Sequence, residues 1–349
     1  MNVLELNFER TWRGGERQTI YNIEGLRQEG VAVTLLCRKG FPLEQKARER
    51  DIRVVSFGNI LGVIFYLLLN GRKYDVFHAQ TSHILTYCLL TKPLHRSKVV
   101  FSRRVDFVPK GWLTRLKYRH TDEIVAISEA VKEIVSKFSG RTDVKVASDI
   151  VVPVKLDPAK ARHILETKGI ASNKIIVGTV AALVPHKDPL TMVAAVKELS
   201  KKRSDFIFLH AGTDELEEEL SKKITELGLE QLYFPLGFVE DVEQLFSVFD
   251  VFVMSSQEEG LGSSVLDAFV YKVPVVGTDA GGLNELLADG RAVRCRKKEA
   301  AAIAEGINKL LSDKTLRDSI VQNAYDYVLQ KHNLHYITEQ YLNIFARKK

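Results

Sequence analysis

Residues 251–270 read VFVMSSQEEGLGSSVLDAFV, and they predict the structural unit from which the chain is built. The apolar run 251–254 is typical of a buried strand in a parallel sheet. A loop with Gly260 and Gly262 follows, and Ser263 and Ser264 are residues that favour the start of a helix. A strand that turns through a glycine loop into a helix is the repeating element of an open α/β sheet.

The same alternation of short apolar runs and helix-length segments continues along nearly the whole sequence. Because its 349 residues exceed the roughly 250–300 at which one hydrophobic core stops growing, we expect two domains. Each should be a doubly wound α/β domain built on a parallel sheet. The predicted strands are 2–7, 31–37, 54–57, 76–79, 99–102, 123–127, 144–146, 175–180, 205–210, 232–235, 251–254, 273–277 and 291–294.

A stretch with two prolines and few large apolar residues, 153–174, is the expected linker. We therefore expect the first domain to comprise residues 1–165 and the second to comprise residues 166–336. Hydrophobic residues make up 45% of the chain and charged residues 27%, a balance that argues against disorder.

Three scattered cysteines, Cys37, Cys88 and Cys295, are too few for a disulfide framework or a zinc site. The sequence shows no signal-peptide pattern and no uncharged apolar run of ~18 residues. A cytoplasmic location is expected. Trp112 and the apolar stripe 60–69 are expected to pack in the core or on the domain surface rather than to form a lipid site.

The net charge of +6 is unevenly distributed, with +11 in residues 1–172 and −5 in residues 173–349. Nine basic residues and one acid lie within 92–119, interleaved with aromatic residues. Such a stretch could contact nucleic acid, phosphorylated glycans or an anionic membrane, or it could be a solvated helix face. Charge alone does not decide between these partners.

Ligands of open α/β sheets bind at the carboxyl ends of the strands, where loops lead into helices. Four candidate loops lie there, marked by the pair Gly14–Gly15, by Lys187, by residues 255–264 and by the pair Gly281–Gly282. Backbone N–H groups and the helix dipole at such turns favour anions such as phosphate. No GxGxxG motif is present, which disfavours a nicotinamide enzyme.

The segment EGLGSSVLDA, from Glu259 to Ala268, resembles the hallmark of the retaining GT-B-fold glycosyltransferases of family 4, also called glycosyl transferases group 1. That hallmark has two Glu residues separated by seven others, set as EGFGxxxLEA after a strand. The resemblance covers essentially the whole chain, and its further matches are 14–16, 78–80, 127–130, 237–241, 272–276, 281–285 and 289–290.

The resemblance implies an α/β protein of GT-B fold, with two doubly wound Rossmann-like domains facing across a cleft. The C-terminal helix, 337–349, would cross back onto the first domain, which would hold the acceptor. It also implies transfer of a sugar from a nucleotide-diphosphate sugar to an acceptor hydroxyl, with retention of anomeric configuration. A UDP-, GDP- or ADP-sugar would be the co-substrate, and neither a metal nor a bound cofactor is expected.

Glu259 would then orient the donor sugar and support the cationic anomeric carbon. Lys187, an arginine and the amides of residues 262–264 would stabilise charge on the departing diphosphate. The expected catalytic residues are Glu259, Lys187 and Arg104. The expected donor-binding residues are Gly14, Gly15, His78, Arg103, Gly260, Leu261, Gly262, Ser263, Ser264 and Asp267. His78 could instead be a satisfied histidine of the core.

Three departures from the family pattern bear on this assignment. The second acid is Asp267, which is one methylene shorter than Glu. Ala182 stands where relatives commonly carry an Arg, so that Lys187 is the only cation of that loop. Many relatives carry a His after the fifth strand, where this chain has Arg103 and Arg104, and one of these arginines is expected to compensate.

The expected partners are a nucleotide-sugar donor, a glycan or glycolipid acceptor of lipopolysaccharide or other cell-surface polysaccharide assembly, and an anionic membrane surface. No nucleic acid is expected. The protein would be peripheral on the inner face of the cytoplasmic membrane. Two alternatives remain: a GT-B-fold nucleotide-sugar 2-epimerase, which would isomerise the donor, and a non-enzymatic basic protein whose binding to nucleic acid would depend steeply on salt.

Overall fold

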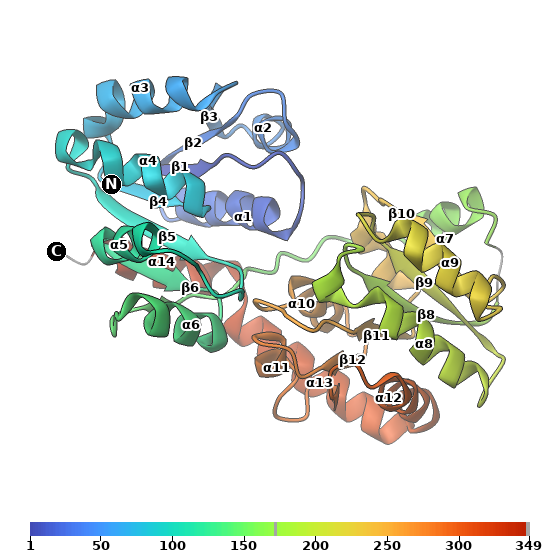
Figure 1. Cartoon of the computed structure of the whole chain (residues 1–349). Coiled ribbons are helices and arrows are strands. Elements are labelled where there is room, and N and C mark those ends of the chain that lie inside the picture. The colour runs from blue at the N-terminus through green and yellow to red at the C-terminus, as the bar shows by residue number, and fades with distance from the viewer. Residues whose placement is uncertain (171–172, 347–349) are drawn as a thin grey trace. The chain divides into compact units, whose positions relative to one another are not determined.

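A computed structural model describes residues 1–170 and 173–346, which form two compact α/β units (Figure 1). Unit 1 comprises Met1–Val152 and the chain from His332 onward, and unit 2 comprises Pro153–Lys331. In both units every strand of the main sheet pairs in parallel with its neighbours. The predicted fold class, two Rossmann-like parallel sheets, is confirmed.

The sheet of unit 1 has seven strands in the order β3-β2-β1-β4-β5-β6-β7. In this register Glu5 of β1 lies beside His78 of β4. The strands are β1 (Asn2–Asn7), β2 (Ala32–Arg38), β3 (Arg53–Phe57), β4 (Val76–Ala79), β5 (Lys98–Arg103), β6 (Glu123–Ala126) and β7 (Lys145–Val146).

Helices cover both faces of this sheet. Side chains of α1, α2 and α14 share one apolar core with Val3, Val33 and Val100 of the strands. On the other face, Phe77 stacks on His95 of α4 and Phe101 packs on Tyr118 of α5. The helices are α1 (Gly14–Gln28), α2 (Pro42–Arg48), α3 (Ile60–Asn70), η1 (Gly71–Lys73), α4 (Ser82–His95), α5 (Trp112–His120), α6 (Glu129–Ser139) and α14 (Leu334–Ala346).

The sheet of unit 2 has six strands in the order β10-β9-β8-β11-β12-β13. They are β8 (Ile175–Val180), β9 (Phe206–Ala211), β10 (Tyr233–Gly237), β11 (Val251–Met254), β12 (Val275–Thr278) and β13 (Val293–Cys295). The helices are α7 (Pro158–Thr167), η2 (Pro185–Lys187), α8 (Pro189–Ser200), α9 (Glu217–Glu226), η3 (Val242–Ser247), α10 (Ser263–Val270), α11 (Leu283–Leu286), α12 (Ala300–Ser312) and α13 (Lys314–Lys331).

The predicted strands agree with the observed ones to within about two residues at each end, but the expected boundary between the domains does not match the division of the chain. The division falls at Val152–Pro153, whereas residue 165 lies inside α7. That helix packs on η3 and buries Ala161 and Leu165, so it belongs to unit 2 rather than to a linker. Residues 171–172 of the expected linker and 347–349 of the expected last helix lie outside the described residues.

The last helix, α14, is part of unit 1 and packs against α1. Gly25 makes this approach possible, because a Cβ atom there would lie 2.0 Å from Oγ1 of Thr338. Ile337, Tyr341 and Phe345 of α14 are buried in the core of the unit. The end of the chain therefore completes the core of the unit that the start of the chain forms.

Replacing Gly25 with Ala should lower the free energy of unfolding of unit 1 by about 1–3 kcal/mol, because the added methyl group forces α14 away from α1. Urea unfolding measures this effect. The matched control is Gly58→Ala, whose Cβ would meet nothing within 4 Å, and its change should stay within about 0.5 kcal/mol. An equal, small change in both variants would show that α14 does not pack closely at Gly25.

Candidate functional site

Three of the four predicted loops meet at the carboxyl edge of the unit 2 sheet. The hydroxyl of Ser255 donates to the carbonyl oxygens of Lys187 and Asp188, at 3.0 and 2.9 Å. The N–H of Gln257 donates to His186 O at 2.8 Å, and that of Gly282 donates to Glu259 O at 2.8 Å. The loops after β8, β11 and β12 are therefore tied together by their own backbones.

An ion pair between Lys187 and Glu259 lies where these loops meet. The Lys187 ammonium donates to Oε2 of Glu259, and the hydroxyl of Ser256 lies 3.1 Å from the same oxygen. Thr278 fixes Ser256 in turn, by donating to its carbonyl oxygen at 2.6 Å. The two charged side chains are 19% and 11% exposed, so both are partly shielded and still reach solvent. The structure thus brings together two residues that the sequence predicts to be catalytic.

The predicted glycine loop leads into α10 beside this ion pair. Gly262 is the residue before the helix and has φ +100°, which a residue with a side chain rarely adopts. Gly260, Leu261 and Gly262 are buried, and Ser263 and Ser264 are half-buried in the first turn. Their N–H groups form the positive end of the helix dipole, which suits an anion.

Asp267 lies one turn into α10 and is 8% exposed. Asp267 belongs to the helix that follows Gly262, and the sequence analysis assigns it to donor binding. The role of Asp267 in donor binding stays a prediction.

Two residues at the end of β9 hold the loop that carries Lys187, and the sequence analysis missed both. The ring of His210 hydrogen-bonds to Ala181 O at 3.1 Å and to the hydroxyl of Tyr233 at 2.7 Å. Gly212 approaches the same carbonyl so closely that a Cβ atom would lie 1.9 Å from it. The sequence signal for these residues was His-Ala-Gly at the end of a strand. It was overlooked because it contains no glycine pair.

His78, a predicted residue of unit 1, lies within a buried polar network of its sheet. His78 bonds through Nδ1 to Glu5 at 2.6 Å and through Nε2 to Ser102 at 2.8 Å, and its side chain has no exposed surface. Gln80 donates to the other oxygen of Glu5 at 3.0 Å, and the hydroxyl of Tyr341 lies 3.1 Å from that of Ser102. These contacts are those of a satisfied core histidine, and a binding role for His78 would require the network to open.

Arg103 and Arg104 are also engaged within unit 1. Arg103 donates to the carbonyl oxygens of Val105 and Phe107, at 3.0 and 2.6 Å, and to a tyrosine hydroxyl. Arg104 pairs with Asp149, and its Cδ lies 3.9 Å from the Cβ position of Gly15. Binding of the diphosphate by Arg103 or Arg104 stays a prediction. For it, the arginine would have to give up one of these hydrogen bonds or its ion pair and bind phosphate instead.

The predicted pair Gly14–Gly15 forms the first turn of α1. Glu16 caps this turn by accepting from the backbone N–H of Arg13 at 2.8 Å, and burial raises the pKa of its carboxyl group. The glycine pair therefore opens a helix, as the sequence predicts, beside the half-buried Arg104.

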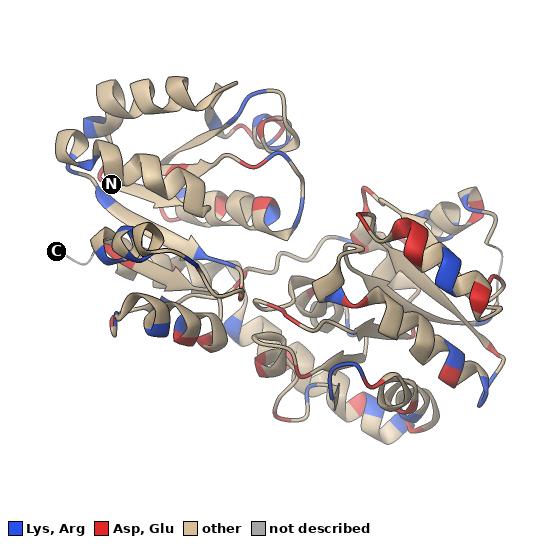
Figure 2. Cartoon of the chain, in the orientation of Figure 1, with Lys and Arg blue, Asp and Glu red and all other residues tan. Residues whose placement is uncertain are grey.

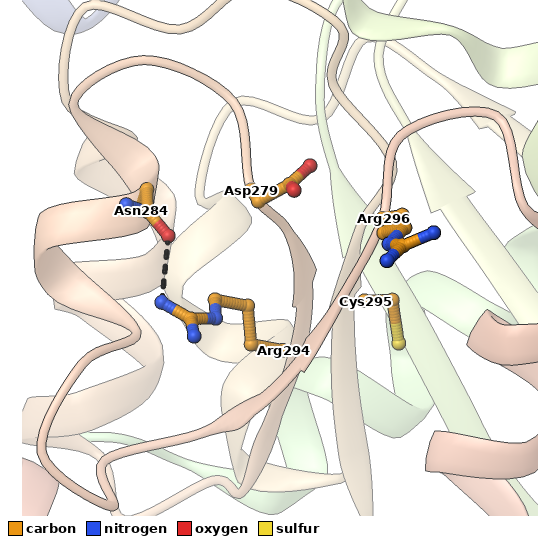
Figure 3. A pocket seen from close by; sticks show the side chains of 5 residues that line it. All are labelled: Asp279, Asn284, Arg294, Cys295 and Arg296. Atoms are coloured by element: carbon orange, nitrogen blue, oxygen red, sulfur yellow. Dashed lines mark hydrogen bonds between the residues drawn. The ribbon is translucent and has the colours of Figure 1, made fainter.

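A pocket of about 470 Å³ lies at the edge strand β13 of unit 2 (Figure 3). In it, Arg294 donates to the side-chain oxygen of Asn284 at 3.0 Å. It is lined by Asp279, Asn284, Arg294, Cys295 and Arg296. Asp279 and Asn284 belong to the loop and helix after β12, so the pocket adjoins the fourth predicted loop.

Two family models match most of the chain. The model for glycosyl transferases group 1 matches residues 161–327, and the model for glycosyltransferase family 4 matches residues 12–148.

Similar proteins include the lipopolysaccharide core biosynthesis glycosyltransferase LpsE of Rhizobium meliloti, 27% identical over 100% of both chains. A second is the UDP-Gal:alpha-D-GlcNAc-diphosphoundecaprenol alpha-1,3-galactosyltransferase of Escherichia coli, 24% identical over 78% of each chain. The crystal structure of HepE from Anabaena in complex with UDP-glucose has a TM-score of 0.86 and 21% identity, and covers 99% of both chains.

The stability of unit 2 should fall as the pH falls from 6.5 to 4, because burial lowers the pKa of His210 to about 4. In this window the unfolded chain binds a proton at His210 that the folded chain does not, so acid favours unfolding. The contribution is about 2 kcal/mol between pH 7 and pH 4.5. Urea unfolding of wild type and His210→Gln at both pH values measures it. The variant should be less stable at pH 7 but lose less on acidification, and an equal loss in both proteins would contradict the assignment.

Proposed function

The chain belongs to the glycosyl transferases group 1 of family 4, and we propose that it transfers a sugar, with retention of configuration, from a nucleoside-diphosphate sugar to a hydroxyl of a glycan or glycolipid. It is a glycosyl-transferring enzyme of the GT-B fold. The relatives support the finer proposal: one acts in lipopolysaccharide core biosynthesis, one on a diphosphoundecaprenol-linked sugar, and a structural neighbour binds UDP-glucose. UDP-sugars are therefore the first donors to test, before GDP- and ADP-sugars.

The observation that carries this proposal is the ion pair of Lys187 and Glu259 beside the start of α10. A cation, a carboxylate and the N–H groups of a helix terminus are gathered within one set of mutually bonded loops. The ammonium of Lys187 has three N–H donors, so it can serve a phosphate oxygen while it keeps its bond to Glu259. Preorganised donors of this kind stabilise charge that develops on a leaving diphosphate.

In the proposed reaction the bond between the anomeric carbon and the diphosphate oxygen breaks, and a bond from the acceptor oxygen forms on the same face of the sugar. The leaving phosphate oxygen takes the proton of the acceptor hydroxyl. Glu259 orients the donor sugar and supports the positive charge of the anomeric carbon. Asp267 accepts hydrogen bonds from ribose hydroxyls, and residues 260–264 surround the diphosphate.

For the acceptor we propose an intermediate of lipopolysaccharide or other cell-surface polysaccharide, bound by unit 1. The protein would then work in the cytoplasm, peripheral on the inner face of the cytoplasmic membrane. The surplus of basic residues in the first half of the chain supports an anionic acceptor or an anionic lipid surface.

Replacing Glu259 with Gln should lower kcat about 100-fold or more and leave the affinity for the nucleoside diphosphate unchanged, because the carboxylate acts on the sugar. Product analysis with UDP-, GDP- and ADP-sugars and calorimetry with the nucleotides measure the two effects. Glu258→Gln, an exposed neighbour in the same loop, is the matched control and should keep wild-type turnover. Wild-type turnover by Glu259→Gln would rule out this role, and isomerisation of the donor without transfer would favour the 2-epimerase.

Replacing Lys187 with Ala should weaken binding of the nucleoside diphosphate about 10- to 100-fold, because a charged hydrogen bond contributes about 1.5–3 kcal/mol. Ala182→Arg should tighten binding, since it adds a second cation to the same loop. The exposed Lys222→Ala serves as the control for loss of one positive charge in unit 2. Calorimetric titration measures all three. Normal binding by Lys187→Ala would move the search for the phosphate-binding cation to Arg103 and Arg104.

A further inference from the structure

Helix α3 leaves four of its large apolar side chains exposed, although the sequence predicts that this stripe packs within the domain or on its surface. Its sequence, ILGVIFYLLLN, contains no charged residue. Only Val63 and Leu67 are buried, whereas Leu61, Phe65 and Leu69 are 74%, 65% and 66% exposed. One side of the helix is sufficient to cover the sheet, so the other side faces solvent.

The neighbouring helices continue this apolar surface. Helix α3 packs on α4, and α4 packs on α5, where Lys117 donates to the hydroxyl of Ser82 at 2.7 Å. Trp112, at the start of α5, is 73% exposed. We call the following exposed side chains the apolar face: Leu61, Phe65, Leu68, Leu69, Leu90, Leu94, Phe107, Val108, Trp112, Leu113 and Leu116.

Unit 2 provides an internal comparison. Its exposed large apolar side chains among the described residues are Val154, Phe238 and Leu329, which come from three distant segments of the chain. Single exposed apolar side chains are normal on proteins, whereas a gathering of them on adjoining helices marks an interaction surface.

Basic residues lie on the same elements as the apolar face, but fewer of them are exposed than the sequence suggested. Between residues 59 and 120 the chain has eleven basic and two acidic residues. The structure turns several of the basic residues inward: Lys92 pairs with Asp122 at 2.7 Å, Arg104 pairs with Asp149, and Arg103 and Lys117 hydrogen-bond within the unit. The remaining exposed cations are Arg72, Lys73, Arg96, Lys110, Arg115 and Arg119.

These exposed cations lie in η1, just after α4 and in or before α5, while α3 itself is free of charge (Figure 2). The surface therefore combines an uncharged apolar helix with positive charge at its margins. This is the composition of a protein surface that rests in the headgroup region of a bilayer. Trp, such as the exposed Trp112, is enriched in that region.

We propose that the apolar face docks on an anionic lipid bilayer, with α3 lying in the interface and the exposed cations contacting lipid headgroups. None of the helices in the described part of the chain is long and apolar enough to cross a bilayer. The docking proposed here is peripheral, with the apolar face at the level of the lipid headgroups. The inference deepens the peripheral location proposed above and does not depend on the transfer chemistry.

A lipid surface fits this face better than a second copy of the chain does. In a symmetric dimer the same surface would meet itself, so that its six exposed cations would approach one another. Like charges brought together oppose association. An anionic bilayer instead supplies both the apolar layer for α3 and the negative charge for the cations.

The test is sedimentation with vesicles of phosphatidylcholine alone or mixed with phosphatidylglycerol, at low and high salt. The first variant, Leu61→Ser/Phe65→Ser/Leu69→Ser, changes exposed side chains of α3. The second, Lys73→Ala/Lys110→Ala/Arg115→Ala, removes exposed cations. The matched control is Val154→Ser/Phe238→Ser in unit 2. Circular dichroism and thermal unfolding verify that each variant folds.

Wild type and control should bind the mixed vesicles, most tightly at low salt. The α3 variant should bind at least about tenfold more weakly at both salt concentrations. The cation variant should lose its binding mainly at low salt, where charges are least screened. In a Trp12→Phe background the fluorescence of Trp112 should shift to the blue when the mixed vesicles are added.

Wild-type binding by the α3 variant, or no binding by wild type at low salt, would overturn the proposal. So would a wild-type dimer in light scattering that the α3 variant abolishes, since a second copy would then cover this face. Donor binding and transfer to a water-soluble acceptor are measured on the same proteins. If these persist while vesicle binding fails, the docking surface is wrong and the proposed transferase function stands.

Discussion

The ion pair between Lys187 and Glu259 depends on hydrogen bonds that join two separate loops, and this junction organises the candidate site. The residues are 72 positions apart in the chain. Their loops meet because β8 and β11 are neighbours in a parallel sheet, so that both strands end at the same edge. Ser255 then locks one loop to the other through two backbone carbonyls. A cation and a carboxylate held in this way need little rearrangement to meet a charged ligand.

The edges of the two sheets use polar side chains differently. In unit 2 the ion pair of Lys187 and Glu259 remains partly exposed. In unit 1 the buried polar residues form hydrogen bonds with one another instead. Glu5, His78, Ser102 and Tyr341 are buried, and each contacts at least one of the others. Buried polar groups that are fully hydrogen-bonded specify one arrangement of a core. The polar groups at the edge of unit 1 therefore fix one another, while the charged pair of unit 2 remains accessible to solvent.

Much of the fold could be predicted from the sequence, because buried parallel strands are continuous apolar runs and glycine loops mark their carboxyl ends. The segments around Gly262 and Lys187 were found in this way. The partners of the basic residues could not be found. Arg104 lies 45 positions from Asp149 and Lys92 lies 30 positions from Asp122, and only the topology brings these charges together. A basic stretch in a sequence does not tell which of its charges reach solvent.

The same limit applies to the exposed side chains of α3. An apolar stripe at helical spacing predicts that a helix packs, but a short helix over a sheet buries only one side, and Val63 and Leu67 are enough for that. The remaining large apolar side chains of α3 are exposed. On the opposite face of the same sheet, α14 packs on α1, and its Ile337 and Tyr341 share an apolar core with side chains of α1. Among the described residues α3 is in contact with α4, η1 and β3, and its outer side belongs to the surface proposed above to dock on a bilayer.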